Sequence, residues 1–183
     1  MTKIVLTYGL ISAAISAIMW TGIALLMRNG DGFNHGMLIG YTSMLVSIFI
    51  IYFAIRSYRD NIGGGTVTFG KAFLIGLCIS IIFAVFYVIT WMILRKTLLP
   101  DFVENYLSYK RHELQQSGLT AATISKEMAE AEQMREWFAN PWMEAVMVFT
   151  EPWPVAIIVS LVSAFILSRK KKIDVGRYGE ATT

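Results

Sequence analysis

The chain has few charged residues and very little cysteine, histidine or proline. Charged residues make up 16% of its 183 residues, whereas a soluble domain carries about 25%. Its one cysteine, Cys78, excludes an internal disulfide. An apolar share of 55% and a mean hydropathy of +0.54 exclude a disordered chain and a collagen-like fibre. This composition indicates a membrane protein.

Apolar residues are gathered into long runs instead of being spread along the chain. Three runs without a charge cover residues 4–27, 36–55 and 72–94, and each reaches the roughly 20 residues that a helix needs to cross a membrane. A fourth run, from Pro152 to Ser168, has 17 uncharged residues and predicts a span over about 150–168. We therefore predict an all-α polytopic membrane protein with four transmembrane helices in a single membrane domain, residues 1–183.

The distribution of basic residues predicts the orientation of these spans. Four spans place both termini on one side, and the segments on that side hold nine of the sixteen Lys and Arg residues. Basic residues favour the cytoplasmic side, so we expect both termini inside, with a basic cytoplasmic tail at 169–183. Arg95 and Lys96 flank a span on the outer side and argue weakly against this orientation. The net charge of +3 is therefore explained by basic residues that gather at a membrane edge, and we expect no nucleic-acid partner.

The only sizeable polar region, residues 95–144, predicts an extracytoplasmic helical hairpin between spans three and four. Its first helix begins near the N-cap candidate Asp101 and stops before Gly118. Its second begins at Thr120 and stops at Asn140–Pro141. One face of the second helix is apolar and comprises Ile124, Met128, Ala131, Met134, Trp137 and Phe138. This face either packs on its neighbour or forms a docking surface for a partner or ligand.

No motif predicts a catalytic, cofactor or metal site. Residues 65–71 fit the first seven positions of a phosphate-binding loop, but Ala72 stands where a Ser or Thr must bind magnesium. An apolar span follows this loop, where a P-loop has a soluble helix, and no strand precedes it. His112–Glu113 begins like a zinc-protease motif, but Gln116 replaces the second histidine. We expect no enzyme activity, no cofactor and no metal.

Small residues recur at helical spacing and predict close helix packing. They include Gly36, Gly40 and Ser43 in the second span and Gly76 and Ser80 in the third. Small side chains let helix backbones approach each other, which is how helices associate in lipid. These faces either pack inside one bundle or meet a second copy or another membrane protein.

Glu151-Pro152-Trp153-Pro154 is the most informative local feature of the sequence. Pro152 and Pro154 each lack a backbone donor and so distort a helix or mark its first turn. Glu151 lies either at the membrane interface or inside the membrane, where a carboxylate is a functional candidate. Lys71, at the start of the third span, is the other charged candidate.

The order of these motifs resembles a known family. The segments that carry the resemblance are residues 36–44, Arg56-Ser57-Tyr58-Arg59-Asp60, Thr68-Phe69-Gly70-Lys71-Ala72-Phe73 and Glu151-Pro152-Trp153-Pro154-Val155. Together they resemble the bacterial integral membrane family called domain of unknown function 4199 over nearly the whole chain. The resemblance implies a four-helix protein of the bacterial inner membrane. It carries no known activity, ligand or catalytic residue.

Two functional hypotheses follow. The first is a non-enzymatic accessory or scaffold subunit that contacts the lipid bilayer and a membrane-protein partner or a second copy of itself. The small-residue faces and the hairpin favour it. The alternative is a small transporter or ion-conducting component that uses Glu151, with Lys71 and polar residues of the spans. The sequence names neither the ligand nor the partner.

Overall fold

The computed structural model describes residues 1–28 and 33–169, with the side chains of 33–38 outside the description. Residues 29–32, the predicted tail beyond Arg169 and the surroundings of Gly36 therefore lie outside the described part. Among the described residues all regular secondary structure is helical, which confirms the all-α prediction. The helices are α1 (Thr2–Arg28), α2 (Phe33–Asn61), α3 (Phe69–Thr97), α4 (Phe102–Gln116), α5 (Ala121–Ala139), α6 (Pro141–Thr150) and α7 (Trp153–Ser168).

Four stretches of helix are long and apolar enough to cross a membrane. They are Thr2–Arg28, Ile39–Asn61, Phe69–Thr97 and Pro141–Ser168. A helix is favoured in lipid because it satisfies every backbone polar group within one segment. The fourth stretch begins nine residues before the predicted start at 150, because α6 runs directly into α7. Residues 141–144 therefore belong to this stretch and not to the polar region at 95–144.

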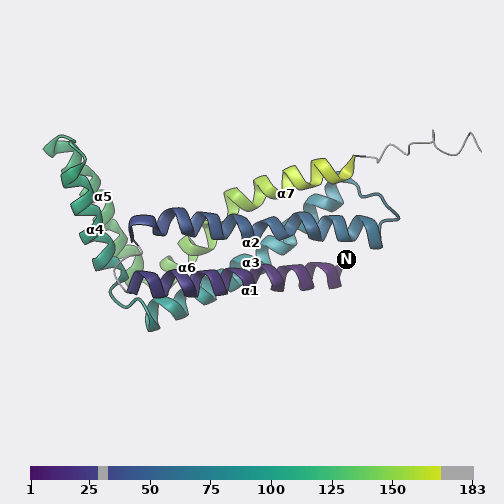
Figure 1. Cartoon of the computed structure of the whole chain (residues 1–183), viewed down its shortest axis with the longest axis horizontal. Helices are drawn as coiled ribbons and strands as arrows, with labels where there is room; N and C mark the ends of the chain where they lie inside the picture. Colours follow the sequence, from purple (N-terminus) through teal and green to yellow (C-terminus); the bar gives the residue numbers. More distant parts are fainter. Residues whose placement is uncertain (29–32, 170–183) are drawn as a thin grey trace, which may run out of the picture.

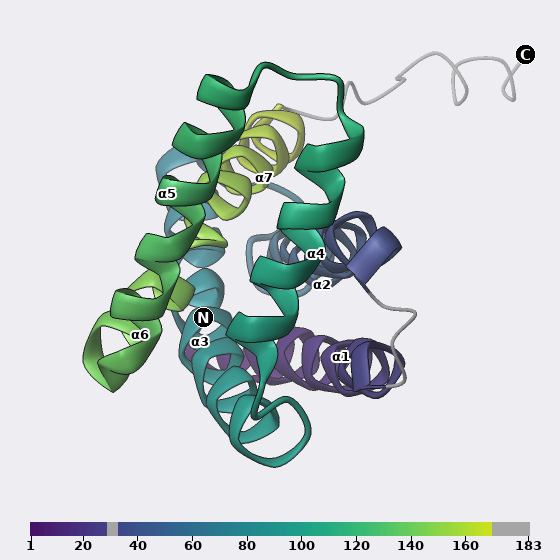
Figure 2. The ribbon, with the colours of Figure 1, turned by 90° about the vertical axis from the view of Figure 1, so that its left-hand side faces the viewer.

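These stretches form one bundle, and the α4–α5 pair projects from its end. α3 packs against α1, α2, α6 and α7, while α2 also packs against α1 and α7. Figures 1 and 2 show α4 and α5 side by side beyond one end of the bundle, and the N-terminus lies at the opposite end. The interior is filled by aliphatic and aromatic side chains that include Ile48, Ile51, Ile75, Ile79 and Phe83.

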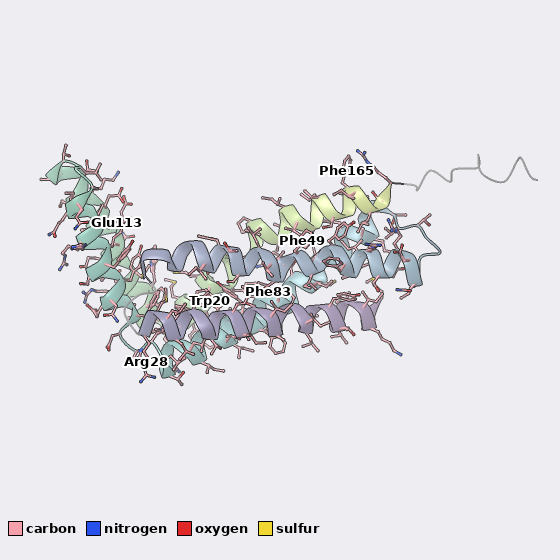
Figure 3. The ribbon with its side chains drawn as sticks, in the orientation of Figure 1. Trp20, Arg28, Phe49, Phe83, Glu113 and Phe165 are labelled. Carbon is pink, nitrogen blue, oxygen red and sulfur yellow. The ribbon has the colours of Figure 1, made fainter. Side chains whose placement is uncertain are left out.

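Large apolar side chains also cover the outside of the bundle. They include Leu25 of α1, Phe49 of α2, Ile93 of α3, Val146 of α6 and Phe165 of α7. Figure 3 shows Phe49 and Phe165 on two of these helices. No side chain of α4 or α5 is among the exposed large apolar residues of the described chain. Such an apolar exterior suits lipid rather than water, which agrees with four helices that are long and apolar enough to cross a membrane.

Small residues lie at two of the helix contacts. The buried Ser12 of α1 donates a hydrogen bond to the Ser47 carbonyl of α2 over 2.5 Å. A Cβ added to Gly76 of α3 would lie 2.5 Å from Ser160 Oγ of α7. These contacts bring the backbones close, as small residues do in membranes.

Of the other predicted packing residues, Ser43 and Ser80 are buried, whereas Gly40 faces open space. Ser43 is buried, and its hydroxyl donates to the Gly40 carbonyl over 2.7 Å within α2. Ser80 is buried and donates to the Gly76 carbonyl over 2.8 Å. A Cβ on Gly40 would meet nothing within 4 Å, so the backbone of no neighbouring described helix approaches it closely.

The ends of the helices follow local chemistry only in part. Thr120 caps α5 as predicted, because its hydroxyl accepts from the Thr123 backbone N–H over 3.3 Å. Asp101 holds the N-cap position of α4 but makes no side-chain cap there. Gly118, with φ +69°, turns the chain between α4 and α5, a conformation that glycine adopts without a Cβ clash.

Candidate functional site

Three polar or aromatic side chains of α3 form a row that faces two carboxylates. Tyr87, Trp91 and Arg95 are spaced by four residues, which places them on one side of the helix. Glu144 of α6 and Glu151, which follows α6, lie opposite this row and are seven residues apart. We call these five residues the polar ladder.

Glu144 is the buried acid of the polar ladder. Its side chain is 3% exposed, and its Oε1 accepts from Trp91 Nε1 over 2.9 Å and from Arg95 Nε over 2.5 Å. A buried carboxylate is stable only when it is paired and hydrogen-bonded. Glu144 meets both conditions through α3, so it joins α6 to α3.

Arg95 also connects the bundle to the α4–α5 pair. Its Nη2 donates to the Phe138 carbonyl at the end of α5 over 2.9 Å, and its guanidinium lies 5.4 Å from the Phe138 ring centroid. The Trp91 ring meets Phe102 of α4 edge-on at 5.0 Å, and Phe102 stacks on Phe138 at 6.0 Å. Arg95 and these rings fix the base of the pair to the bundle.

The Arg95 side chain is also partly exposed, at 22%. It lines a groove of about 270 Å³ together with Asp101, Glu104 and Arg135. Arg135 binds Glu104 at 2.7 Å, which links α5 to α4. The groove is therefore lined by charges of both signs at the base of the α4–α5 pair.

Glu151 forms the inner end of the polar ladder. The Tyr87 hydroxyl donates to Glu151 Oε2 over 3.1 Å. Trp142, which is 82% exposed near the start of α6, suits the headgroup level. Glu151 lies nine positions further along the chain, about 13 Å along a helix axis at 1.5 Å per residue. Glu151 is exposed on the surface of the bundle, and whether it lies at the interface or inside the membrane stays a prediction.

The two prolines explain why the helix breaks beside Glu151. Pro152 and Pro154 have no N–H to donate to the carbonyls of Val148 and Thr150, four residues earlier. Glu151 ends α6 with a helical backbone, and Pro152 precedes α7. Pro152 also keeps a right-handed helical backbone, with φ −76° and ψ −11°, so the span stays nearly continuous across the break.

Trp20 of α1 lies against the polar ladder. Its ring meets those of Tyr87 and Trp91 edge-on, with centroids 5.8 Å and 5.4 Å apart. Figure 3 labels it on α1. Its buried indole N–H has no hydrogen-bond partner among the described residues. The Trp20 indole therefore packs against both aromatic residues of the polar ladder.

Lys71 is remote from Glu151. It is exposed near the start of α3, with its Nζ 5.7 Å from the Tyr58 ring centroid. Tyr87, the partner of Glu151, is sixteen residues further along α3, about 24 Å away at 1.5 Å per residue. The two candidate charges of the sequence therefore do not form one site. Among the described residues, no group of three or more His, Cys, Asp or Glu is placed to hold a metal ion.

Sequence reasoning missed Trp91, Arg95 and Glu144 as parts of one site. From the sequence, Arg95 is expected only as a charge that flanks the third span on its outer side. One signal was present: Glu144 and Glu151 are seven residues apart in a stretch without other acids, 137–168. That spacing places two carboxylates on the same face of a continuous helix.

Comparison with known proteins gives one result. The model of a family described as "Protein of unknown function (DUF4199)" matches residues 7–169. No curated protein matches the chain, and no solved structure does. The match covers most of the chain and agrees with the resemblance seen in its motifs. The chain therefore belongs to the DUF4199 family of proteins of unknown function.

Proposed function

We propose that the protein is a non-enzymatic accessory or scaffold subunit of a bacterial inner membrane, and that the α4–α5 pair contacts its partner. One observation carries the proposal. The pair projects beyond the bundle (Figure 1), while Arg95 ties its base to the membrane-embedded helices. A fixed projection presents a surface in one orientation, which reduces the ordering cost of binding.

The surface of the pair supports this role. α5 has no buried residue, so its outer face is available along its whole length. Ion pairs hold α5 to α4, with Arg135 bound to Glu104 at 2.7 Å and Arg111 to Glu132 at 3.6 Å. Exposed pairs of this kind contribute little stability. The buried Leu107 and Leu114 of α4 provide apolar packing within the pair, and the outer face of α5 has no role in the bundle.

Purification from the native membrane tests the proposal. We expect the tagged protein, extracted in a mild detergent, to carry a stoichiometric second membrane protein or a second copy of itself. Ala129→Arg, on the exposed face of α5, should reduce recovery of the partner, because a bulky charge would enter the contact. The composition and mass of the purified complex measure both effects.

Ile62→Arg is the matched control, because Ile62 is exposed at the opposite end of the bundle. It should leave the partner bound. Recovery of a monomer without a partner would contradict the proposal. Equal partner recovery from wild type and Ala129→Arg would exclude the outer face of α5 as the contact.

The proposal includes an orientation with both termini in the cytoplasm and the α4–α5 pair outside. Among the described residues, the end of the bundle opposite the pair holds five basic residues and one acid: Lys3, Arg56, Arg59, Lys71, Arg169 and Asp60. Such an excess of Lys and Arg favours the cytoplasmic side. A reporter that is active only in the periplasm should work when fused at Gln115 and fail when fused at Thr183. The reverse pattern would contradict this orientation.

A second function is favoured by the break in the fourth span. Discontinuous membrane helices build binding sites in many transporters, and here the break lies beside Glu151, which is held by Tyr87. If Glu151 carries protons, Glu151→Gln should abolish pH-dependent flux into proteoliposomes while the protein stays folded. Glu113→Gln is the comparison variant, because it neutralises an exposed carboxylate of α4 outside the spans. No wild-type flux, or flux unchanged by Glu151→Gln, would exclude this function.

A further inference from the structure

A groove opens between α1 and α2 near the end of the bundle that carries the N-terminus. It has a volume of about 360 Å³ and is lined by Tyr8, Phe53, Arg56, Ser57, Asp60 and Asn61. The groove is therefore lined by two aromatic rings, two opposite charges, a hydroxyl and an amide. This groove is remote from the α4–α5 pair and plays no part in the proposed partner contact.

The charged residues of the groove are only loosely paired with each other. Arg56 is 56% exposed, and its Nε lies 3.6 Å from Asp60 Oδ2, which is beyond hydrogen-bonding distance. Asp60 binds Arg59 more closely, at 2.7 Å, and remains 43% exposed. Arg56 can therefore bind a phosphate oxygen, and Asp60 keeps an exposed carboxylate beside it.

The groove lies where a phospholipid headgroup would lie. Arg56 is the first charged residue after the apolar run 36–55. Phe53 and Phe49 precede Arg56 on α2 and are four residues apart from each other. Their side chains are 44% and 54% exposed, and their rings pack edge-on with centroids 5.7 Å apart. Their spacing gives a continuous apolar track from the groove toward the middle of the span, which an acyl chain can cover.

We propose that this groove binds a phospholipid whose headgroup carries a phosphate and a primary amine, such as phosphatidylethanolamine. Arg56 binds the phosphate through a charge-assisted hydrogen bond. Asp60 accepts a hydrogen bond from the ammonium group, and one acyl chain covers Phe53 and Phe49. Two opposite charges four residues apart match a zwitterionic headgroup, in which the phosphate and the amine are joined by two carbons.

Native mass spectrometry of the detergent-purified protein tests this assignment with three lipids of equal chain length. We expect phosphatidylethanolamine to bind more tightly than phosphatidylcholine, whose methylated amine cannot donate, and phosphatidylglycerol, which has no amine. Arg56→Gln should weaken binding of all three by about tenfold, because the loss of one charged hydrogen bond costs about 1.5 kcal/mol. Asp60→Asn should remove only the preference for phosphatidylethanolamine.

Arg28→Gln is the matched control, because it removes an exposed arginine at the other end of α1, as Figure 3 shows. It should leave lipid binding unchanged, and all variants should keep the wild-type circular dichroism spectrum. Equal binding of the three lipids by the wild type would overturn the assignment of the amine. Unchanged binding in Arg56→Gln, or equally tight binding of soluble phosphoethanolamine, would overturn the lipid site itself.

Discussion

Glu144→Ala should lower the free energy of unfolding by about 3 kcal/mol or more, the cost of breaking a buried ion pair by removing one partner. The substitution leaves Arg95 without its carboxylate and Trp91 Nε1 without its acceptor. It also removes the carboxylate that positions the Arg95 guanidinium, which donates to the Phe138 carbonyl at the base of the α4–α5 pair. Unfolding in mixed micelles, followed by tryptophan fluorescence, measures the change.

Two variants make this result specific to the buried pair. Glu113→Ala removes an acid that is 50% exposed on α4 and paired with Lys110 at 3.0 Å, which Figure 3 shows far from the bundle. It should cost about 0.5 kcal/mol or less, as exposed pairs do. Replacing both partners, Arg95→Met with Glu144→Leu, should recover much of the stability lost in either single variant, because no unpaired charge then remains.

Equal effects of Glu144→Ala and Glu113→Ala would show that Glu144 is not held in a buried pair. If the double variant is no more stable than either single variant, the loss of stability would come from altered packing of the site and not from an unpaired charge. Limited proteolysis in the α4–α5 turn, near Gly118, gives an independent measure. Cleavage there should accelerate in Glu144→Ala if Arg95 loses its hold on α5.

Gly76→Ala should destabilise the bundle by about 1–3 kcal/mol, the usual cost of overpacking a close contact. The new Cβ would lie 2.5 Å from Ser160 Oγ and 2.8 Å from Ser160 Cβ, closer than real Cβ atoms approach their neighbours. α3 and α7 would therefore have to move apart. The shift in thermal unfolding midpoint, read by size-exclusion chromatography after heating, reports the loss.

The chain offers both a control and a rescue for this variant. Gly70 lies on the same helix, but a Cβ there would meet nothing within 4 Å. Gly70→Ala should therefore be neutral or slightly stabilising, because alanine favours a helix over glycine. Adding Ser160→Gly to Gly76→Ala should restore stability by removing the clashing atoms. A stable Gly76→Ala protein would mean that α3 and α7 do not approach at this point.

Much of the fold could be predicted because lipid imposes simple rules on a sequence. Runs without charge at 4–27 and 72–94 must become helices, since unsatisfied backbone groups are costly in hydrocarbon. The break between α4 and α5 was marked by Gly118 and by the cap Thr120. The ordered motifs were sufficient to identify the family.

The start of the fourth span could not be predicted from hydropathy alone. Glu144 and Glu151 interrupt the apolar run, and a charge near a span normally marks its end. Their cost is offset by partners on α3, because Arg95 and Trp91 bind Glu144 and Tyr87 binds Glu151. Those partners are 49 to 64 residues away along the chain, so no local window contains both sides of the interaction.

The sequence by itself determined that this is an all-helical membrane protein with four spans and a polar helical segment, because composition and period are local properties. The tertiary structure decided which of its charges act together. It separated Lys71 from Glu151 and joined Arg95 to Glu144. It also placed Arg56 and Asp60 beside Tyr8 of another helix. The physical reason is that a buried charge is stable only beside its partner, and the packing of the helices decides which residues become neighbours.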